Sequence, residues 1–337
     1  MNIPLYPFRF TPIYKNLVWG GDRIPKKFNR DLPPGVYAES WEISCREDGM
    51  SVVKNGALKG LPLSSLLQRA PKEILGSRAQ GSDFPLLFKI IDARECLSVQ
   101  VHPNIKNAKE QGTEPKTEAW CFLGETSSKI WCGLKKGARK TDFSAPITSE
   151  TIQKTLREIE VQNGEIVFVP GGRIHAIGRG ALLYEVQQNS NTTYRIYDWD
   201  RLGHDGKPRQ LHTEEALQTI DWEDQEDPII QPKQISTESD STCFEVLCCP
   251  FFRLEKILLS GTLETPLSGE SFHVLFVAEG SARIEWKEGA EQIDMGTSLL
   301  IPAGLGTYRL SGEATLLRTS IPEEVEQGNG VSPSISN

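Results

Sequence analysis

The chain has 337 residues, of which 38% are hydrophobic and 24% are charged, a composition typical of a globular protein with about two domains. Its 37 basic and 45 acidic residues give a net charge of −8, which argues against a nucleic-acid partner that needs a basic face. No apolar run approaches the ~18 residues of a membrane span, and prolines with Arg9 interrupt the N-terminal segment where a signal peptide is apolar. Seven irregularly spaced cysteines indicate reduced thiols, so we predict a cytoplasmic protein without nucleic-acid or membrane partners.

Short β-forming segments follow one another along the chain, separated by proline and glycine. This pattern is typical of a sandwich or a barrel. In chain order, strands are predicted over residues 85–91, 97–102, 166–169, 181–186 and 194–197.

Helical patterns are confined to a few segments. One begins within residues 61–67, and a longer one is predicted over Ser149–Ile159, because Ile152, Leu156 and Ile159 recur at helical spacing. Thr213 begins a third, in the manner of a capped helix. The acidic residues 221–241 are interpreted as a linker, and the residues 327–337, rich in Gly, Ser, Pro and Asn, as a frayed tail.

One pattern occurs twice. Residues 164–175 and 296–307 both read G-x5-P-x-G-x2, a strand followed by a tight turn. The first copy then has His175, whereas the second has Thr307. The pattern resembles the second motif of the cupins, which are small double-stranded β-helix barrels. Two copies predict two barrels, of which only the first keeps a metal-ligand position.

The strand 97–102 alternates between apolar and polar residues. Ser98, Gln100 and His102 share one face, and burying three polar side chains together is costly unless they have partners. A bound metal and a polar ligand would explain them; a solvated face is the alternative.

Two further residues extend this set. Glu118 opens the next strand, and His175 follows the Pro-Gly turn. Two imidazoles, a carboxylate and the amide oxygen of Gln100 suit a four-ligand zinc-type site with room for a substrate oxygen. Iron or manganese would accept the same ligands. Of the other histidines, His204 is interpreted as a solvated loop residue, His212 as a structural residue or one that supports a ligand, and His273 as a core or edge residue.

The segment 184–199 is predicted to form two strands joined by an Asn-Ser-Asn turn, as in a hairpin. Glu185 and Gln187 share a face of the first strand, and Thr193, Arg195 and Tyr197 share a face of the second. The segment is either an ordinary hairpin with solvated charges or one that directs a carboxylate and a guanidinium toward a pocket.

Eight motifs, taken in order and together, resemble one family. They are Val18-Trp-Gly-Gly21, Glu39-Ser-Trp-Glu42, Leu97-Ser-Val-Gln-Val-His-Pro103, Pro115-Lys-Thr-Glu118, the turn 170–175, Glu185-Val-Gln-Gln-Asn-Ser190, Thr193-Tyr-Arg-Ile-Tyr-Asp-Trp199 and Arg209-Gln-Leu-His212. With these and Lys89, residues 5–320 resemble the type I mannose-6-phosphate isomerases in their short bacterial form. Asn191 stands where that family commonly has Asp, and Pro115 where its longer members have His.

The resemblance implies a mainly β fold with two cupin-type jelly-roll barrels and a few short helices. It also implies a zinc-dependent isomerase that interconverts mannose 6-phosphate and fructose 6-phosphate through an enediol. The implied sites are one zinc ion held by Gln100, His102, Glu118 and His175, with Lys89 and Ser98 at the sugar phosphate, Lys116 beside the metal and Arg195 at the reacting carbons.

Several alternatives stay open at this point. The general base is expected to be Glu185, with a zinc-bound water as its rival. A cupin dioxygenase would use a similar metal site but needs no phosphate grip, and a non-catalytic sugar-binding or regulatory cupin needs no Glu185–Arg195 pair. We expect a catalytic domain over 1–240, a metal-free cupin domain over 241–322 and a tail over 323–337, in a monomer or weak homo-oligomer.

Overall fold

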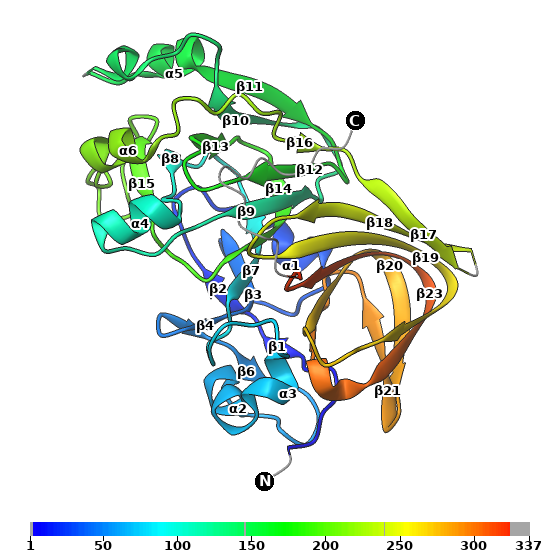
Figure 1. Cartoon of the computed structure of the whole chain (residues 1–337). Helices are drawn as coiled ribbons and strands as arrows, with labels where there is room; N and C mark the ends of the chain where they lie inside the picture. The colour runs from blue at the N-terminus through cyan, green and yellow to red at the C-terminus, as the bar shows by residue number, and fades with distance from the viewer. Residues whose placement is uncertain (1–2, 145, 239, 324–337) are drawn as a thin grey trace. The chain divides into compact units, whose positions relative to one another are not determined.

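The computed structural model of the protein describes residues 3–144, 146–238 and 240–323; the predicted tail 327–337 lies outside these residues. The described chain is mainly β, as predicted (Figure 1). It divides into two compact units, described separately below. Unit 1 comprises the described residues of 1–12, 42–85 and 231–337, and unit 2 those of 13–41 and 86–230. Residues 42–85 therefore group with the C-terminal part of the chain.

Unit 2 contains two antiparallel sheets that share a core. Trp120 and Phe122 of one sheet pack in the same buried cluster as Ile130 and Cys132 of the other. The five-stranded sheet has the order β11 (Leu156–Val161), β10 (Ser128–Leu134), β13 (His175–Ile177), β8 (Val99–Val101) and β15 (Tyr194–Tyr197). The seven-stranded sheet has the order β16 (Ile229–Ile230), β12 (Ile166–Val169), β9 (Glu118–Phe122), β14 (Leu182–Gln188), β7 (Leu86–Asp92), β3 (Glu39–Ile43) and β2 (Ile13–Lys15).

The strands predicted from short apolar segments are confirmed. Those at the middle of the larger sheet are covered on both faces: every residue of β7 and β9 is buried, and so is β14 apart from its last residue. This is why their sequences read as nearly continuous apolar runs in which a buried charge stands out. The helices of unit 2 are α1 (Arg23–Lys27), α4 (Ile105–Gln111), α5 (Ser149–Thr155), α6 (Thr213–Thr219) and the 3₁₀ helix η1 (Lys140–Phe143).

The long helix predicted over Ser149–Ile159 is wrong in its second half. The helix α5 ends at Thr155, and Leu156–Val161 forms strand β11, which pairs with β10. The sequence Leu-Arg-Glu-Ile-Glu-Val also fits an edge strand, because its two apolar ends are buried and the residues between them are partly or fully exposed. Pairing with β10 therefore favours a strand over a continued helix at these residues.

The predicted hairpin at 184–199 is also wrong. Strand β14 pairs with β7 and β9 in the larger sheet, whereas β15 pairs with β8 in the smaller one. The connection between them therefore crosses from one sheet to the other, and Glu185 and Arg195 come from opposite sheets. The linker prediction fails in part for a similar reason, since residues 229–230 and 233–238 are paired as strands.

Unit 1 is built around one antiparallel sheet with long strands (Figure 1). Its core includes Leu275, Ile284 and Tyr308, and Nδ1 of the partly exposed His273 lies 3.0 Å from the Tyr308 hydroxyl. The sheet has the order β17 (Lys233–Glu238), β18 (Ser241–Cys248), β19 (Arg253–Pro266), β23 (Thr307–Ser320), β20 (His273–Trp286) and β21 (Gly289–Asp294), with β22 (Ser298–Ile301) paired to β20. The remaining elements are β1 (Phe10–Thr11), β4 (Cys45–Arg46), β5 (Gly49–Met50), β6 (Val52–Val53), α2 (Leu63–Arg69), α3 (Pro71–Leu75) and η2 (Ala303–Leu305).

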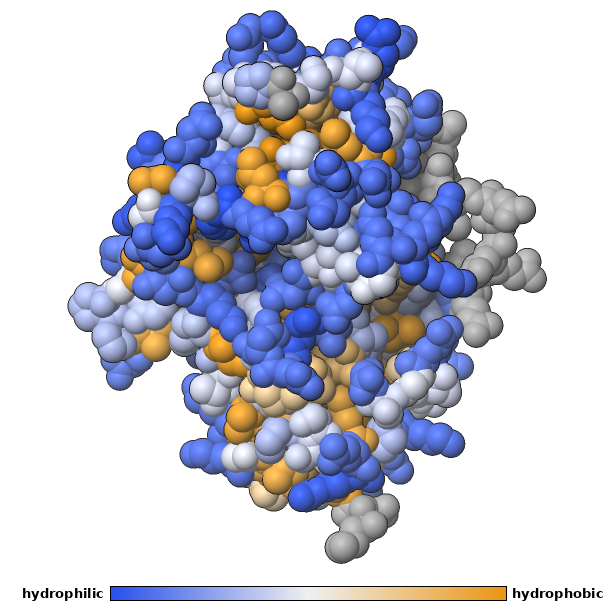
Figure 2. Space-filling view, turned by 90° about the vertical axis from the view of Figure 1, so that its left-hand side faces the viewer, coloured by the Kyte–Doolittle hydropathy of each residue, from blue (hydrophilic) through white to orange (hydrophobic). Residues whose placement is uncertain are grey.

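Among the described residues, no helix has the length and apolar character to cross a bilayer. Figure 2 shows a face that is mostly hydrophilic, with hydrophobic residues in small scattered patches.

Close approach of two strands fixes Gly178 at the end of β13. A Cβ atom there would lie 2.0 Å from the Lys129 carbonyl oxygen of β10. We expect Gly178→Ala to lower the free energy of unfolding by about 1–3 kcal/mol, because the sheet must shift to accept the methyl group. Denaturant unfolding measures the change. Gly124→Ala is the control, since its nearest atom is 3.4 Å away; an equal loss in both variants would contradict the argument.

Candidate functional site

Three buried side chains converge where the two sheets of unit 2 face each other. His102 directly follows β8, Glu118 opens β9 and His175 opens β13. The Glu118 carboxylate lies 3.6 Å from Nε2 of His102 and 3.5 Å from Nε2 of His175. One ligand atom from each lies within 4.8 Å of the others, and no other such group of three His, Cys, Asp or Glu side chains occurs in residues 3–144, 146–238 and 240–323.

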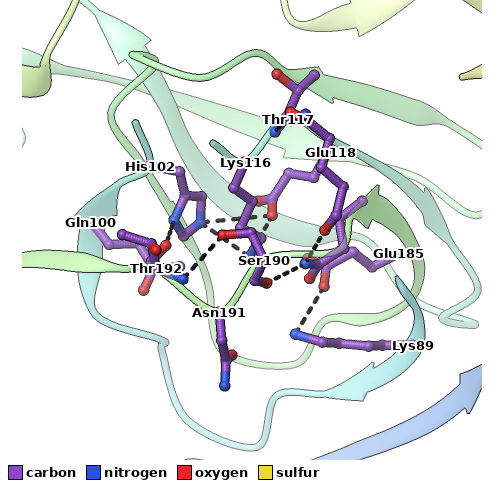
Figure 3. Close-up of polar contacts among 12 residues, drawn as sticks. Lys89, Gln100, His102, Lys116, Thr117, Glu118, Glu185, Ser190, Asn191 and Thr192 are labelled. Carbon is purple, nitrogen blue, oxygen red and sulfur yellow. Dashed lines mark hydrogen bonds and ion pairs between the residues drawn. The ribbon is translucent and has the colours of Figure 1, made fainter. Parts of the chain in front are cut away.

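Hydrogen bonds set the tautomer of both histidines. Nδ1 of His102 donates to the Thr192 carbonyl at 2.8 Å, which Figure 3 shows, and Nδ1 of His175 donates to the Arg173 carbonyl at 2.9 Å. Each Nε2 is then left with a lone pair directed toward Glu118. Burial lowers the pKa of His102 well below its usual value and that of His175 to about 4. Both imidazoles are therefore neutral near pH 7, which is the form that binds metals.

The amino group of Lys116 lies at the centre of this cluster. Its Nζ is 2.7 Å from the Glu118 carboxylate and 3.2 Å from Nε2 of His102 (Figure 3). Burial raises the pKa of Glu118 to about 7, with Glu185 adding to the rise and Lys116 opposing it. The contacts of the Lys116 ammonium group show that the Nε2 lone pair of His102 and the Glu118 carboxylate attract positive charge. A divalent cation also fits this donor set of two imidazoles and a carboxylate.

Gln100 is brought to the same place by strand register. It pairs with His175 across β8 and β13, and its Nε2 lies 3.4 Å from Nε2 of that histidine. The Ser98 hydroxyl donates to the amide oxygen of Gln100 at 3.0 Å. A half-turn of the amide would exchange its nitrogen and oxygen, and would present the oxygen to the centre as a fourth ligand.

A tryptophan joins the triad to a second carboxylate. The indole Nε1 of Trp120 donates to Glu118 at 3.1 Å and to Glu185 at 3.2 Å. Sequence reasoning missed Trp120, although it stands two residues after Glu118 and therefore on the same face of β9. The shared N–H holds two buried carboxylates together.

Lys89 is buried between two carboxylates. Its Nζ lies 3.4 Å from Glu185 and 3.6 Å from Glu39, and its side chain is 6% exposed. Burial opposes ionisation of Glu185, but Lys89 and Lys116 outweigh it, so the pKa of Glu185 is lowered. Glu39 was part of a motif in the sequence, yet its ion pair with Lys89 needs the neighbouring strands β3 and β7 and was not foreseen.

Arg195 lies on the same cross-strand row as the metal-site residues of the smaller sheet. Its partner on β8 is Gln100, which itself faces His175 on β13. The guanidinium is half-buried, and its Nε has no hydrogen-bond partner among the described residues. Burial and the nearby Arg209 lower its pKa. A half-buried guanidinium whose Nε–H donor has no partner is suited to bind a negatively charged group.

His212 accepts a hydrogen bond from the backbone of Arg195, and Asp198 pairs with two neighbouring arginines. The backbone N–H of Arg195 donates to Nδ1 of His212 at 3.3 Å, so this histidine has the structural role predicted for it. The Asp198 carboxylate accepts from Arg201 and Arg209, each at 2.6 Å. The departure at Asn191 lies nearby in the chain; its backbone N–H donates to the Glu114 carboxylate at 3.2 Å.

Comparison with known proteins gives consistent matches over nearly the whole chain. Residues 7–120 match the family described as phosphomannose isomerase type I, catalytic domain, and residues 241–321 match the mannose-6-phosphate isomerase cupin domain. The chain is 35% identical over 312 residues to mannose-6-phosphate isomerase ManA of Bacillus subtilis (strain 168), covering 91% of this chain and 96% of that protein. It is 34% identical over 304 residues to the mannose-6-phosphate isomerase of Streptococcus mutans, covering 89% and 93%. The crystal structure of a mannose 6-phosphate isomerase from Bacillus subtilis matches with a TM-score of 0.85 at 32% identity, covering 93% of this chain and 99% of that one.

The triad predicts how metal binding responds to substitution. His102→Ala or His175→Ala removes one of the two imidazoles, so the affinity for Zn²⁺ as a probe should fall by at least about 100-fold, more than the loss of a residue that only supports a ligand causes. Equilibrium dialysis followed by elemental analysis measures it. His204→Ala is the control, because that histidine is exposed in a loop; retention of tight binding in the two triad variants would refute the ligand set.

Proposed function

The chain belongs to the type I phosphomannose isomerases, and from this premise we propose that it interconverts D-mannose 6-phosphate and D-fructose 6-phosphate with one zinc ion per chain. The observation that carries the proposal is the buried arrangement of His102, Glu118 and His175 beside a second, ionised carboxylate, Glu185. Aldose–ketose isomerisation needs both a Lewis acid and a base at neighbouring carbons.

The proposed zinc ligands are the triad and the amide oxygen of Gln100. When bound, zinc supplies a Lewis acid that polarises the substrate carbonyl and stabilises negative charge on its oxygen. The fixed tautomers of the two histidines support this assignment, since with Nδ1 protonated each Nε2 carries the lone pair that a metal ion needs.

Glu185 is the proposed base. Its carboxylate removes the proton from C2 of mannose 6-phosphate, the C–H electron pair forms the C1–C2 double bond of the enediol, and O1 takes a proton from Lys116. The Glu185 carboxyl then returns its proton to C1 while O2 loses its proton to Lys116 and becomes the carbonyl oxygen of fructose 6-phosphate. The lowered pKa of Glu185 supports the role, because the group is then ionised near pH 7.

Arg195, Lys89 and Ser98 are proposed to contact the rest of the substrate. The unused donor of Arg195 supports a role in stabilising charge on the enediolate. Lys89 and Ser98 are proposed to hold the phosphate, as in the related family. The ion pair of Lys89 with Glu185 adds a second task for this lysine, which is to keep the base ionised.

Catalysis is proposed to take place in unit 2 alone. All the proposed site residues lie in unit 2, and the C-terminal cupin domain over 241–322 is proposed to hold no metal, because Thr307 stands at the place of His175 in the repeat. The seven cysteines are all free, which supports a cytoplasmic enzyme.

A conversion assay tests the reaction itself. Metal-stripped protein should gain activity on mannose 6-phosphate when one equivalent of zinc is restored, and the fructose 6-phosphate formed in D₂O should carry deuterium at C1, because the base exchanges its proton with solvent. Mass spectrometry of the product measures the label. Zinc and sugar-phosphate binding without turnover would instead favour a sugar-binding or regulatory cupin, and deuterium at C1 would exclude a direct hydride shift from C2 to C1.

Arg195→Ala separates charge stabilisation from ground-state binding. If the guanidinium acts on charge that develops only in the enediolate, kcat should fall by about 10²–10³-fold with little change in KM. Steady-state kinetics with confirmed zinc content measures both constants. Arg283→Ala, at a side chain that is 53% exposed in unit 1, should leave them unchanged. A large rise in KM with kcat near wild type would reassign Arg195 to the phosphate.

Lys89→Ala has an expected pH signature. Since Lys89 lowers the pKa of Glu185, its removal should raise that pKa, and the acid limb of the kcat–pH profile should move to higher pH. The loss of a phosphate contact should raise KM at every pH. Lys129→Ala, at a side chain that is 62% exposed, is the control. A variant with an unmoved profile would show that Lys89 does not govern the base, and an unchanged KM would remove it from the phosphate site.

A further inference from the structure

A buried ion pair lies directly behind the metal-site turn. Arg173 belongs to the turn 170–175, and its guanidinium donates to the Asp224 carboxylate through Nε at 2.5 Å and Nη2 at 2.6 Å. The two side chains are 3% and 10% exposed. Nη1 of Arg173 also donates to the Phe168 carbonyl of β12 at 2.9 Å. The acidic segment that the sequence suggested was a linker thus supplies a fixed partner to this turn.

The backbone of Arg173 connects the ion pair to a metal-site histidine. Its carbonyl oxygen accepts the hydrogen bond from Nδ1 of His175 at 2.9 Å. The neighbouring Gly172 donates its N–H to the His102 carbonyl and accepts from the N–H of Asp221, each at 2.8 Å. The position of the Arg173 carbonyl therefore depends on two sets of contacts, the backbone hydrogen bonds of Gly172 and the ion pair of Arg173 with Asp224.

The repeat contains a second copy of this segment without the arginine. In residues 296–307, strand β22 is followed by the 3₁₀ helix η2, with Leu305 at the place of Arg173 and Thr307 at that of His175. The arginine thus occurs in the copy that has the histidine. Other acids of the segment are exposed, as Asp227 is at 69%, whereas Asp224 is buried with both oxygens engaged.

We propose that Asp224 is a positioning residue that acts through Arg173. It fixes the carbonyl that holds His175 in the Nδ1–H tautomer and directs Nε2 toward the metal centre. The inference rests on the proposed function for the identity of the metal as zinc, but the effect on the imidazole is a property of the metal-free protein. Loss of the Asp224 charge leaves a buried guanidinium unpaired, which forces the turn to rearrange.

The first test compares Asp224→Asn with the matched control Asp227→Asn. In metal-free protein carrying ¹⁵N-labelled histidine, the Nδ1–H proton of His175 should exchange with solvent at least tenfold faster in Asp224→Asn. The Nδ1–H of His102, held by Thr192, serves as the internal reference and should stay protected. Zinc affinity should fall by about 10–100-fold, the usual effect of losing a residue that orients a metal ligand. Protection and affinity equal to wild type in Asp224→Asn would overturn the proposal.

A second variant separates positioning from stability. Arg173→Met/Asp224→Leu removes the whole pair, and because no charge is left unpaired, its thermal stability should stay near that of wild type. We still expect faster exchange at His175 and weaker zinc binding. A stable double variant with wild-type exchange and affinity would show that the pair only stabilises the fold. A wild-type protein that binds no zinc would refute the proposed function, while exchange at His175 would still decide the role of Asp224.

Discussion

Lysine and glutamate side chains are buried side by side at the site, and each needs an opposite charge because little water reaches it. Lys89 lies between Glu39 and Glu185, and Lys116 lies against Glu118. An isolated buried charge costs several kcal/mol, so removing any one member leaves a partner uncompensated. The arrangement of the sheets around the site depends on this mutual neutralisation.

The same constraint gives the two carboxylates different chemistry. Glu118 and Glu185 share the indole N–H of Trp120, yet burial raises the pKa of the first while the lysines lower that of the second. Like charges held close together cannot both ionise easily. A cation at the triad would relieve this conflict, because its charge would favour the ionised form of Glu118.

Local patterns in the sequence predicted much of the site. The alternation of Ser98, Gln100 and His102 and the turn ending at His175 correctly predicted that these polar side chains come together, because side-chain direction in a strand is a local property. Contacts between distant segments were not predictable in this way. The split of β14 and β15 between two sheets, the strand after Thr155 and the pairing of Arg173 with Asp224 all depend on partners far along the chain.

The crossing from β14 to β15 has a consequence for the size of the substrate that fits. Glu185 and Arg195 are ten residues apart in the chain, but they stand on opposite walls, so their separation follows the spacing of two packed sheets, about 10 Å. That spacing is set by core side chains such as Ile130 and Trp120, which fill the space between the walls. Substitutions in the core would therefore widen or narrow the gap between Glu185 and Arg195, so the length of a molecule that fits between the two walls depends on residues that do not touch it.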